Sequence, residues 1–224
     1  MSDRIDATPY GGVGLALRMA ERSGLMDAIE EKVRVLKQRQ PYSEADHVMN
    51  MNALCGGTCL EDIKHRKHDA AFLEMLGTLG IPDSTTAGDF CRRFNASDVE
   101  ALQDAINEAR LHVWRAQGDA FVAKTAILDV DGTLVETTGE CKEGADLTYK
   151  KLRGYHPLLV TYANTQEPLF IVNRPGTRPS VEGAPALLDK AIQLCRDAGH
   201  TKIRMRGDTA FSMTRYLDRW HEDG

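Results

Sequence analysis

Apolar residues recur at helical spacing through the first half of the chain. Between residues 13 and 37 they fall mostly every three or four positions around a break at Gly24, which predicts two helices over 13–22 and 25–37. Capping residues followed by apolar positions predict further helices over 43–54, 60–65, 70–76, 84–94 and 98–117. Residues 1–117 are therefore expected to form an all-α region built from short segments.

The pattern changes after Gly118. Stretches rich in β-branched and aliphatic residues predict strands over 121–135, 147–163 and 167–173, the second of them bent near 154–157. An amphipathic helix is predicted over 182–198, then a short strand over 202–205 and a helix starting at 213–221. The chain is therefore predicted to be α/β, with an all-α region over 1–117 and a β-β-β-α-β-α region over 118–224.

Two carboxylates stand at the far end of the first predicted strand, in FVAKTAILDVDGTLV (121–135). Side chains alternate along a strand, so Asp129 and Asp131 share one face. A third carboxylate, Asp208, follows the fourth predicted strand. Carboxylates at the end of a buried strand are costly without a partner, and a divalent cation such as Mg²⁺ or Mn²⁺ is the usual one. The strand ends therefore predict a metal site.

Two classes of enzyme use such a strand. The pentapeptide DVDGT (129–133) alone is similar to the first motif of haloacid-dehalogenase-type phosphatases, where Asp129 would be the nucleophile and Asp131 the acid/base. That motif normally opens its domain and continues into a parallel β-α repeat, whereas here a helical region precedes it and hairpin-like strands follow. The β-β-β-α-β-α order is instead that of an RNase H-like domain, whose adjacent, parallel first and fourth strands each end in a carboxylate.

Six stretches together are far more specific than DVDGT. They are PYSEADHVMN, ALCGGTCLEDI, IPDSTTAGDFCRRF, AILDVDGT, GYHPLLVTYANTQEPLFIVNRPGTRPS and RMRGDTAF, and they cover most of residues 41–211. In these stretches the chain resembles bacterial insertion-sequence transposases of the DDE group-1 type. The resemblance implies an RNase H-like catalytic core behind a helical region that contacts transposon-end DNA. It also implies DNA cleavage and strand transfer with two Mg²⁺ (or Mn²⁺) ions.

Carried over residue by residue, the resemblance puts the first acidic ligand in DVDGT. Asp131 is preferred because the family motif has the ligand just before a small residue and Thr, and Asp129 is the alternative; the second ligand maps onto Asp208 in GDTAF. The third, a glutamate, lies far downstream in the family, and nothing here matches it. Carboxylates such as Glu182, Glu222 and Asp223 are not assigned. We therefore expect a truncated product or a fragment, with one weak metal site and little or no transposition activity.

Composition alone is that of an ordinary globular protein, with 42% hydrophobic and 27% charged residues. No apolar run is long enough for a membrane span, so a cytoplasmic protein is expected. Five scattered cysteines indicate reduced thiols, and the pair Cys55 and Cys59 has no partner pair at zinc-finger spacing.

The net charge of −5 argues weakly against a nucleic-acid partner, but basic residues cluster. The residues expected to contact double-stranded DNA are Lys64, Arg66, Lys67, Arg92, Arg93, Lys150, Lys151, Arg174 and Arg178. Because the family acts on paired ends, a homodimer on DNA is the implied assembly. A non-catalytic DNA-binding remnant of a transposase remains the competing interpretation. Tyr155 and His156 of GYHP could approach the scissile phosphate, but packing within the fold is the simpler interpretation of both residues.

Overall fold

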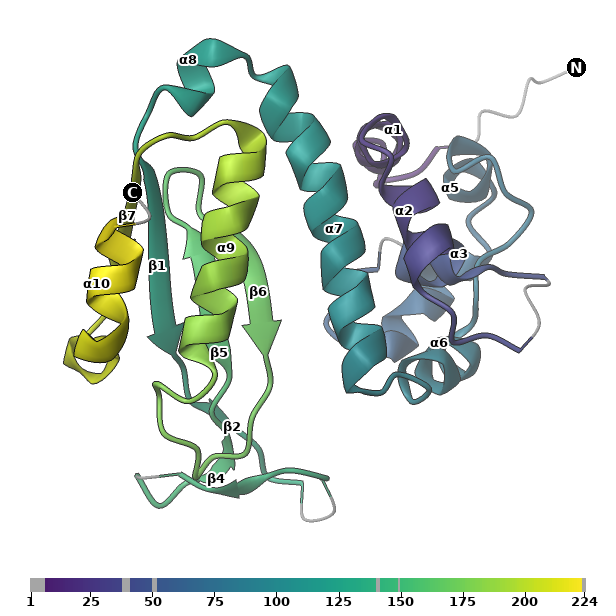
Figure 1. The fold of residues 1–224 in the computed structure, drawn as a ribbon. Coiled ribbons are helices and arrows are strands. Elements are labelled where there is room, and N and C mark those ends of the chain that lie inside the picture. Colours follow the sequence, from purple (N-terminus) through teal and green to yellow (C-terminus); the bar gives the residue numbers. More distant parts are fainter. Residues whose placement is uncertain (1–6, 38–40, 50–51, 140–141, 149, 223–224) are drawn as a thin grey trace, which may run out of the picture. The chain divides into compact units, whose positions relative to one another are not determined.

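The computed structural model describes residues 7–37, 41–49, 52–139, 142–148 and 150–222. The chain divides into two compact units, which we call unit 1 (Met1–His112) and unit 2 (Val113–Gly224). Unit 1 is helical and unit 2 contains the strands, so the fold is mixed α/β (Figure 1).

Unit 1 is assembled from short helices, as the sequence predicts. Its elements are α1 (Val13–Arg22), α2 (Leu25–Lys32), α3 (Glu44–Val48), η1 (Leu60–Ile63), α4 (Lys64–Lys67), α5 (Ala70–Met75) and α6 (Ser84–Cys91). The long helix α7 (Ala96–Ala116) begins in unit 1 and ends in unit 2. None of the helices in the described parts of the chain combines the length and apolar character that crossing a bilayer requires.

Side-chain caps set where these helices start. Ser43 and Asp46 form a reciprocal capping box at α3, and the carboxylates of Asp69 and Asp83 accept the N–H groups at the starts of α5 and α6. The predicted helix over 25–37 is too long: α2 ends at Lys32 because Val33 is already extended, with φ −96° and ψ 126°. The predicted helix over 43–54 is observed as α3, which ends at Val48. Residues 50–51 of the predicted range lie outside the described residues.

The core of unit 1 consists of two apolar clusters. One contains Ile63 and Phe72, both fully buried, with Ile81 beside them. The other contains Ile29 and Val33 of the α2 region and further small residues. Each short helix therefore depends on packing rather than on its own length for stability.

The capping carboxylate of Asp62 gives unit 1 a predicted acid dependence. Its Oδ2 accepts the N–H groups of Thr58 at 2.7 Å and Cys59 at 3.1 Å, and these bonds lower the pKa of Asp62 to about 2. A depressed carboxyl pKa contributes stability above the unfolded value of about 4, and that stability is lost as the pH falls toward 2. Asp62→Asn should therefore lower stability near pH 6 and converge with wild type near pH 2 in far-UV circular dichroism melts. Glu61→Gln, its exposed neighbour, is the control and should melt like wild type at each pH.

Unit 2 contains a four-stranded sheet in the order β6-β5-β1-β7. Its members are β1 (Ala126–Gly132), β5 (Leu158–Tyr162), β6 (Glu167–Val172) and β7 (Ile203–Arg206). β1 is antiparallel to β5 and parallel to β7, with Asp129 level with Arg206. Helix α9 (Ala184–Ala198) connects β6 to β7, and α10 (Thr214–Glu222) follows β7 (Figure 1).

A second, three-stranded sheet interrupts this series between β1 and β5. It contains β2 (Val135–Glu136), β4 (Arg153–Tyr155) and β3 (Asp146–Leu147), in that order. The predicted strand over 147–163 is therefore wrong: it is three strands, because the chain turns with Lys151 at φ 61° and again at Pro157. The predicted strand over 121–135 begins too early, since α8 (Asp119–Val122) occupies its first residues.

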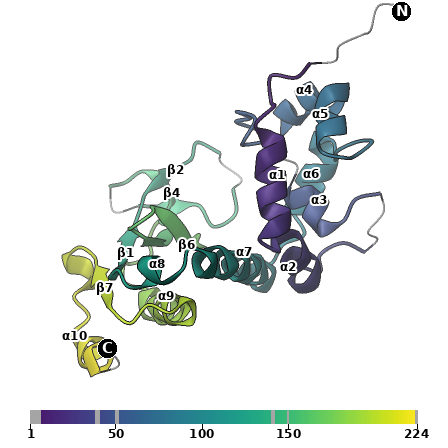
Figure 2. The ribbon, with the colours of Figure 1, turned by 90° about the horizontal axis from the view of Figure 1, so that it is seen from above.

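One face of the four-stranded sheet forms the core of unit 2. Leu128 of β1 and Val160 of β5 are fully buried, and Val130 is nearly so. Helix α9 lies along this sheet (Figure 2) and contributes Leu188 and Cys195. The alternation along β1 leaves Asp129 half-buried and Asp131 exposed on the opposite face.

Candidate active site

The carboxyl ends of β1 and β7 bring Asp131 and Asp208 to the same edge of the sheet. Asp129 is level with Arg206 in the parallel register, and continuing that register by two residues puts Asp131 level with Asp208. Adjacent strands lie about 5 Å apart, and Asp208 follows the last residue of β7 by two positions, so the continued register would put the two backbones near each other. Both residues are exposed.

Asp129 is engaged by an arginine of the neighbouring strand. Arg206 Nε donates to Asp129 Oδ1 at 2.6 Å, and Nη2 donates to Oδ2 at 2.7 Å. This bidentate geometry is the strongest form of an arginine–carboxylate pair. The hydrogen bond that Arg206 donates to Asp129 raises the pKa of Arg206. Asp129 therefore faces a fixed positive charge.

Asp131 and Asp208 are less constrained. Asp208 Oδ1 accepts the N–H of Ala210 at 2.8 Å and so caps η2 (Thr209–Phe211). The side chain of Asp131 makes no hydrogen bond or ion pair within the described ranges. These hard, anionic oxygens, with at most one N–H partner each in that part of the chain, are the kind of donor that Mg²⁺ and Mn²⁺ prefer. The donor set therefore fits a divalent cation.

His156 is packed behind the turn that follows Asp131. The ring is 4% exposed, and Nδ1 lies 2.9 Å from the carbonyl oxygen of Arg178. A carbonyl only accepts, so Nδ1 carries the proton. A Cβ atom added to Gly132 would lie 2.6 Å from His156 Nε2, which leaves room for glycine only. The Gly132 turn and the His156 ring thus fix each other's position.

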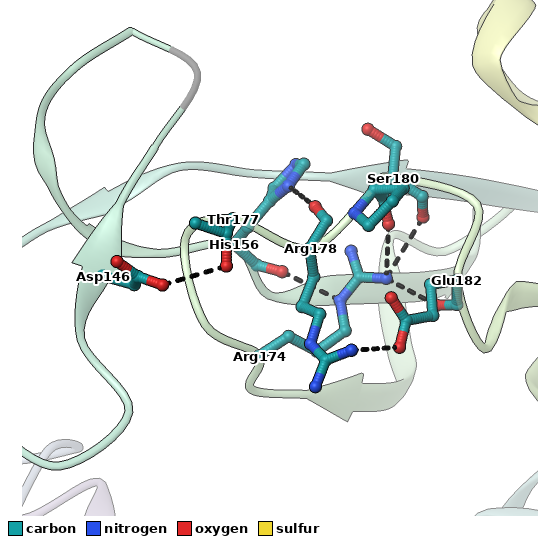
Figure 3. Close-up of polar contacts among 8 residues, drawn as sticks. Asp146, His156, Arg174, Thr177, Arg178, Ser180 and Glu182 are labelled. Carbon is teal, nitrogen blue, oxygen red and sulfur yellow. Dashed lines mark hydrogen bonds and ion pairs between the residues drawn. The ribbon is translucent and has the colours of Figure 1, made fainter.

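Arg174 joins this histidine to the loop after β6. Its Nε donates to the carbonyl of His156 at 2.9 Å, and its Nη1 donates to the carbonyls of Pro179, Ser180 and Glu182 at 3.1, 3.2 and 2.5 Å (Figure 3). The side chain is 8% exposed, and burial lowers the pKa of its guanidinium. Nη2 is buried without a hydrogen-bond partner among the described residues.

The arginines and lysines expected to contact DNA fall into different environments. Arg174 and Arg66 are buried, and Arg66 donates to the side chain of Asn52, so neither guanidinium presents itself to a phosphate at the surface in this conformation. Lys67, Arg92 and Arg178 pair with the carboxylates of Asp83, Asp89 and Glu182, respectively. The others, Lys64, Arg93, Lys150 and Lys151, are exposed.

Of the carboxylates considered for a third acidic ligand, neither Glu182 nor Glu222 is grouped with Asp131 and Asp208. Glu182 pairs with Arg178 at 3.0 Å, Glu222 is the last residue of α10, and Asp223 lies outside the described residues. No group of three or more His, Cys, Asp or Glu side chains suited to a metal occurs in the parts of the chain that the structure describes.

Two features of this edge are not predicted from the sequence. Arg206 is not among the singled-out residues, although RMRGD places it two positions before Asp208 and hence on the same strand face. From the sequence, Gly132 is recognised only as the residue that breaks the strand. Its close approach to His156 depends on the register between β1 and β5.

One of three comparisons with known proteins found a match. Neither the curated proteins nor the solved structures yielded a match. The model of one protein family, described as transposase DDE domain group 1, matches residues 6–224. Since this match spans nearly the whole sequence, the chain belongs to the transposase DDE domain group 1 family, whose members act in DNA transposition.

Proposed function

We propose that unit 2 is an RNase H-like catalytic domain that cleaves and joins DNA at insertion-sequence ends, with Asp131 and Asp208 as its first two acidic ligands. The observation that supports the proposal is the parallel pairing of β1 with β7, in which Asp129 is level with Arg206; continued by two residues, this register would bring Asp131 level with Asp208. The series β1, β5, β6, α9, β7, α10 supports the same assignment, because it is the RNase H-like order with a small sheet inserted.

Mg²⁺ or Mn²⁺ is the proposed cofactor. Asp131 and Asp208 would hold it, and Asp129 is the alternative first ligand. A bound divalent ion supplies charge stabilisation at phosphorus and lowers the pKa of a coordinated water. The protein's own contribution is to fix the two carboxylates on adjacent strand ends and to keep them accessible from solvent.

Asp131 is the better first ligand because of what surrounds Asp129. The bidentate contact with Arg206 already neutralises the negative charge of the Asp129 carboxylate. A cation bound there would have to displace the guanidinium or bind beside it. We assign Asp129 and Arg206 the role of a positioning pair that fixes the relation between β1 and β7 next to the site.

The exposed basic residues are the proposed DNA contacts. In unit 1 these are Lys64, Arg92 and Arg93, together with the half-buried Lys67, and in unit 2 they are Lys150, Lys151 and Arg178. For Arg66 and Arg174 we now propose internal structural roles, because their guanidinium groups are buried. Residues 1–117 would thus supply DNA binding and residues 118–224 the chemistry, and paired ends would be held by a homodimer.

A site with two carboxylates is expected to bind metal weakly. Two-ion catalysis needs enough anionic ligands to hold both ions, and among the described residues no third ligand is grouped with Asp131 and Asp208. We therefore propose that the activity of the 224-residue chain is impaired. If the activity is lost completely, the chain would be a non-catalytic, DNA-binding remnant of a transposase.

The phosphatase alternative has less support. After DVDGT it requires a parallel β-α repeat, whereas β1 pairs antiparallel with β5. It also requires Asp129 as an accessible nucleophile, whereas both oxygens of that carboxylate accept hydrogen bonds from Arg206.

DNA binding and its salt dependence test the proposal. The chain should bind a short duplex, with the logarithm of the affinity falling linearly with the logarithm of the salt concentration. Replacing Arg92 and Arg93 together with Gln should reduce the slope by about 2, since each phosphate contact contributes roughly 0.9. The control is Lys124→Gln with Lys202→Gln, because these residues flank the amino ends of β1 and β7, away from the carboxylates. Failure to bind DNA, or Asp129-dependent turnover of a small phosphoester, would contradict the proposal.

A further inference from the structure

Helix α1 leaves one face in solvent that combines apolar side chains with arginines. Its other side packs into the core of unit 1 through Val13 and Leu17, and the helix contacts α2 (Figure 2). The residues of the solvent face recur at the spacing of a single helix face, and they are Leu15, Arg18, Met19 and Arg22. We call these four residues the α1 face.

The two apolar residues of the α1 face are largely exposed. Leu15 is 66% exposed and Met19 is 70% exposed. They are four positions apart, so they are neighbours on the helix surface and form one small apolar patch. A partner that covers this patch would remove its apolar surface from water, which is favourable.

The two arginines give the α1 face a positive charge. Neither Arg18 nor Arg22 makes a hydrogen bond or ion pair with any residue that the structure describes, whereas Arg92 pairs with Asp89. Glu21 is the only acidic residue of α1, and at 3.6 residues per turn it points roughly 100° away from the centre of the face. The complementary partner is therefore an anion that also carries apolar groups.

We propose that the α1 face lies in the major groove of DNA, with Arg18 and Arg22 on backbone phosphates and Leu15 and Met19 against thymine methyl groups. The major groove is about 12 Å wide and admits an α-helix, and the thymine methyl is the apolar group that it presents. Phosphates are the usual partners of such arginines. This inference rests on the proposed function, which supplies DNA as the ligand, and it adds contacts with the bases.

A lipid surface fits the α1 face less well than DNA does. A helix that lies on a membrane buries a continuous apolar side in the lipid. In α1 that side is already packed in the core of unit 1. Only Leu15 and Met19 would reach the bilayer.

Two short duplexes test the base contacts with the full chain. One consists of alternating A·T pairs, and the other has deoxyuridine in place of thymidine and so lacks only the methyl groups. The wild type should bind the thymidine duplex more tightly, by about fourfold for each methyl group covered. Leu15→Ala with Met19→Ala should lose this preference and keep the salt dependence. Leu79→Ala truncates a fully exposed leucine in another part of unit 1, so this control should keep the preference.

The salt dependence tests the phosphate contacts. Arg18→Gln with Arg22→Gln should weaken the binding of both duplexes equally and reduce the salt slope by about 2. Lys124→Gln with Lys202→Gln is again the control and should leave the slope unchanged. Far-UV circular dichroism melts that match the wild type would exclude a folding defect in each variant.

The outcomes separate this inference from the proposed function. DNA binding without a preference for thymidine, or a preference that Leu15→Ala with Met19→Ala retains, would overturn the inference and leave the proposed function standing. If these variants bind DNA normally but lose self-association or binding to anionic vesicles, the face belongs to a second copy or a membrane, and the inference is also overturned. A chain that binds neither duplex would contradict the proposed function as well.

Discussion

Arg174→Ala is expected to destabilise unit 2 by about 3 kcal/mol. The substitution removes a charged donor from four carbonyl oxygens and leaves them without that partner in a largely buried place. Both tryptophans, Trp114 and Trp220, belong to unit 2, so the fluorescence midpoint in urea reports on this unit. The midpoint should fall with little change in slope.

Arg178→Ala is the matched control, because it removes the same side chain from the same loop at an exposed position. Its ion pair with Glu182 is solvent-exposed and should contribute less than about 1 kcal/mol. Arg174→Lys should rescue little, since an ammonium cannot reproduce the planar fork that reaches several carbonyls. Equal midpoints for Arg174→Ala and Arg178→Ala would show that the buried contacts do not stabilise the loop.

Gly132→Ala is expected to destabilise unit 2 by about 1–3 kcal/mol and to weaken metal binding at Asp131. The added Cβ would lie 2.6 Å from His156 Nε2, and the ring is fixed by Arg178 and has little room to move. Either the ring or the turn that carries Asp131 has to shift. Fluorescence-monitored urea unfolding and Mn²⁺ titration of the same sample measure the two effects.

Gly12→Ala is the control for the added methyl group, since nothing lies within 4 Å of its Cβ position. Because Gly12 belongs to unit 1, its effect is followed by far-UV circular dichroism of the same urea titration. The double variant Gly132→Ala with His156→Ala identifies the cause. Removing the ring should relieve the clash, so the double variant should be more stable than the sum of the two single effects predicts. Strict additivity would place the strain somewhere other than this contact.

Local rules predict much of this fold from the sequence. The capping residues and apolar spacing predict α1 at Val13–Arg22 and come within a few residues for α5, α7 and α9. Hydrophobic runs separated by turn residues also predict, along the chain, the stretches that contain the strands of the main sheet. The carboxylates at the strand ends are also recognised from the sequence, and the family resemblance adds their assignment as acidic ligands.

Features that depend on strand register or on burial cannot be predicted from the sequence. Whether Arg174 faces solvent or the interior is decided by the backbone carbonyls of a loop several residues ahead, which no periodicity reveals. The pair of Asp129 with Arg206 needs the register of a parallel strand that lies 77 residues away. The three-stranded sheet is missed because its strands have only two or three residues, too few for an alternation to be read.

Calorimetric titration of Mn²⁺ into the wild-type chain and its carboxylate variants tests the central claim most directly. We predict that Asp131→Ala and Asp208→Ala each weaken a shared site by more than about tenfold, whereas Asp218→Ala, an exposed carboxylate on α10, leaves it unchanged. That result would mean that the ends of β1 and β7 converge on one ion. Binding that depends on Asp129 or Asp131 but not on Asp208 would contradict the transposase geometry and bring the phosphatase alternative forward.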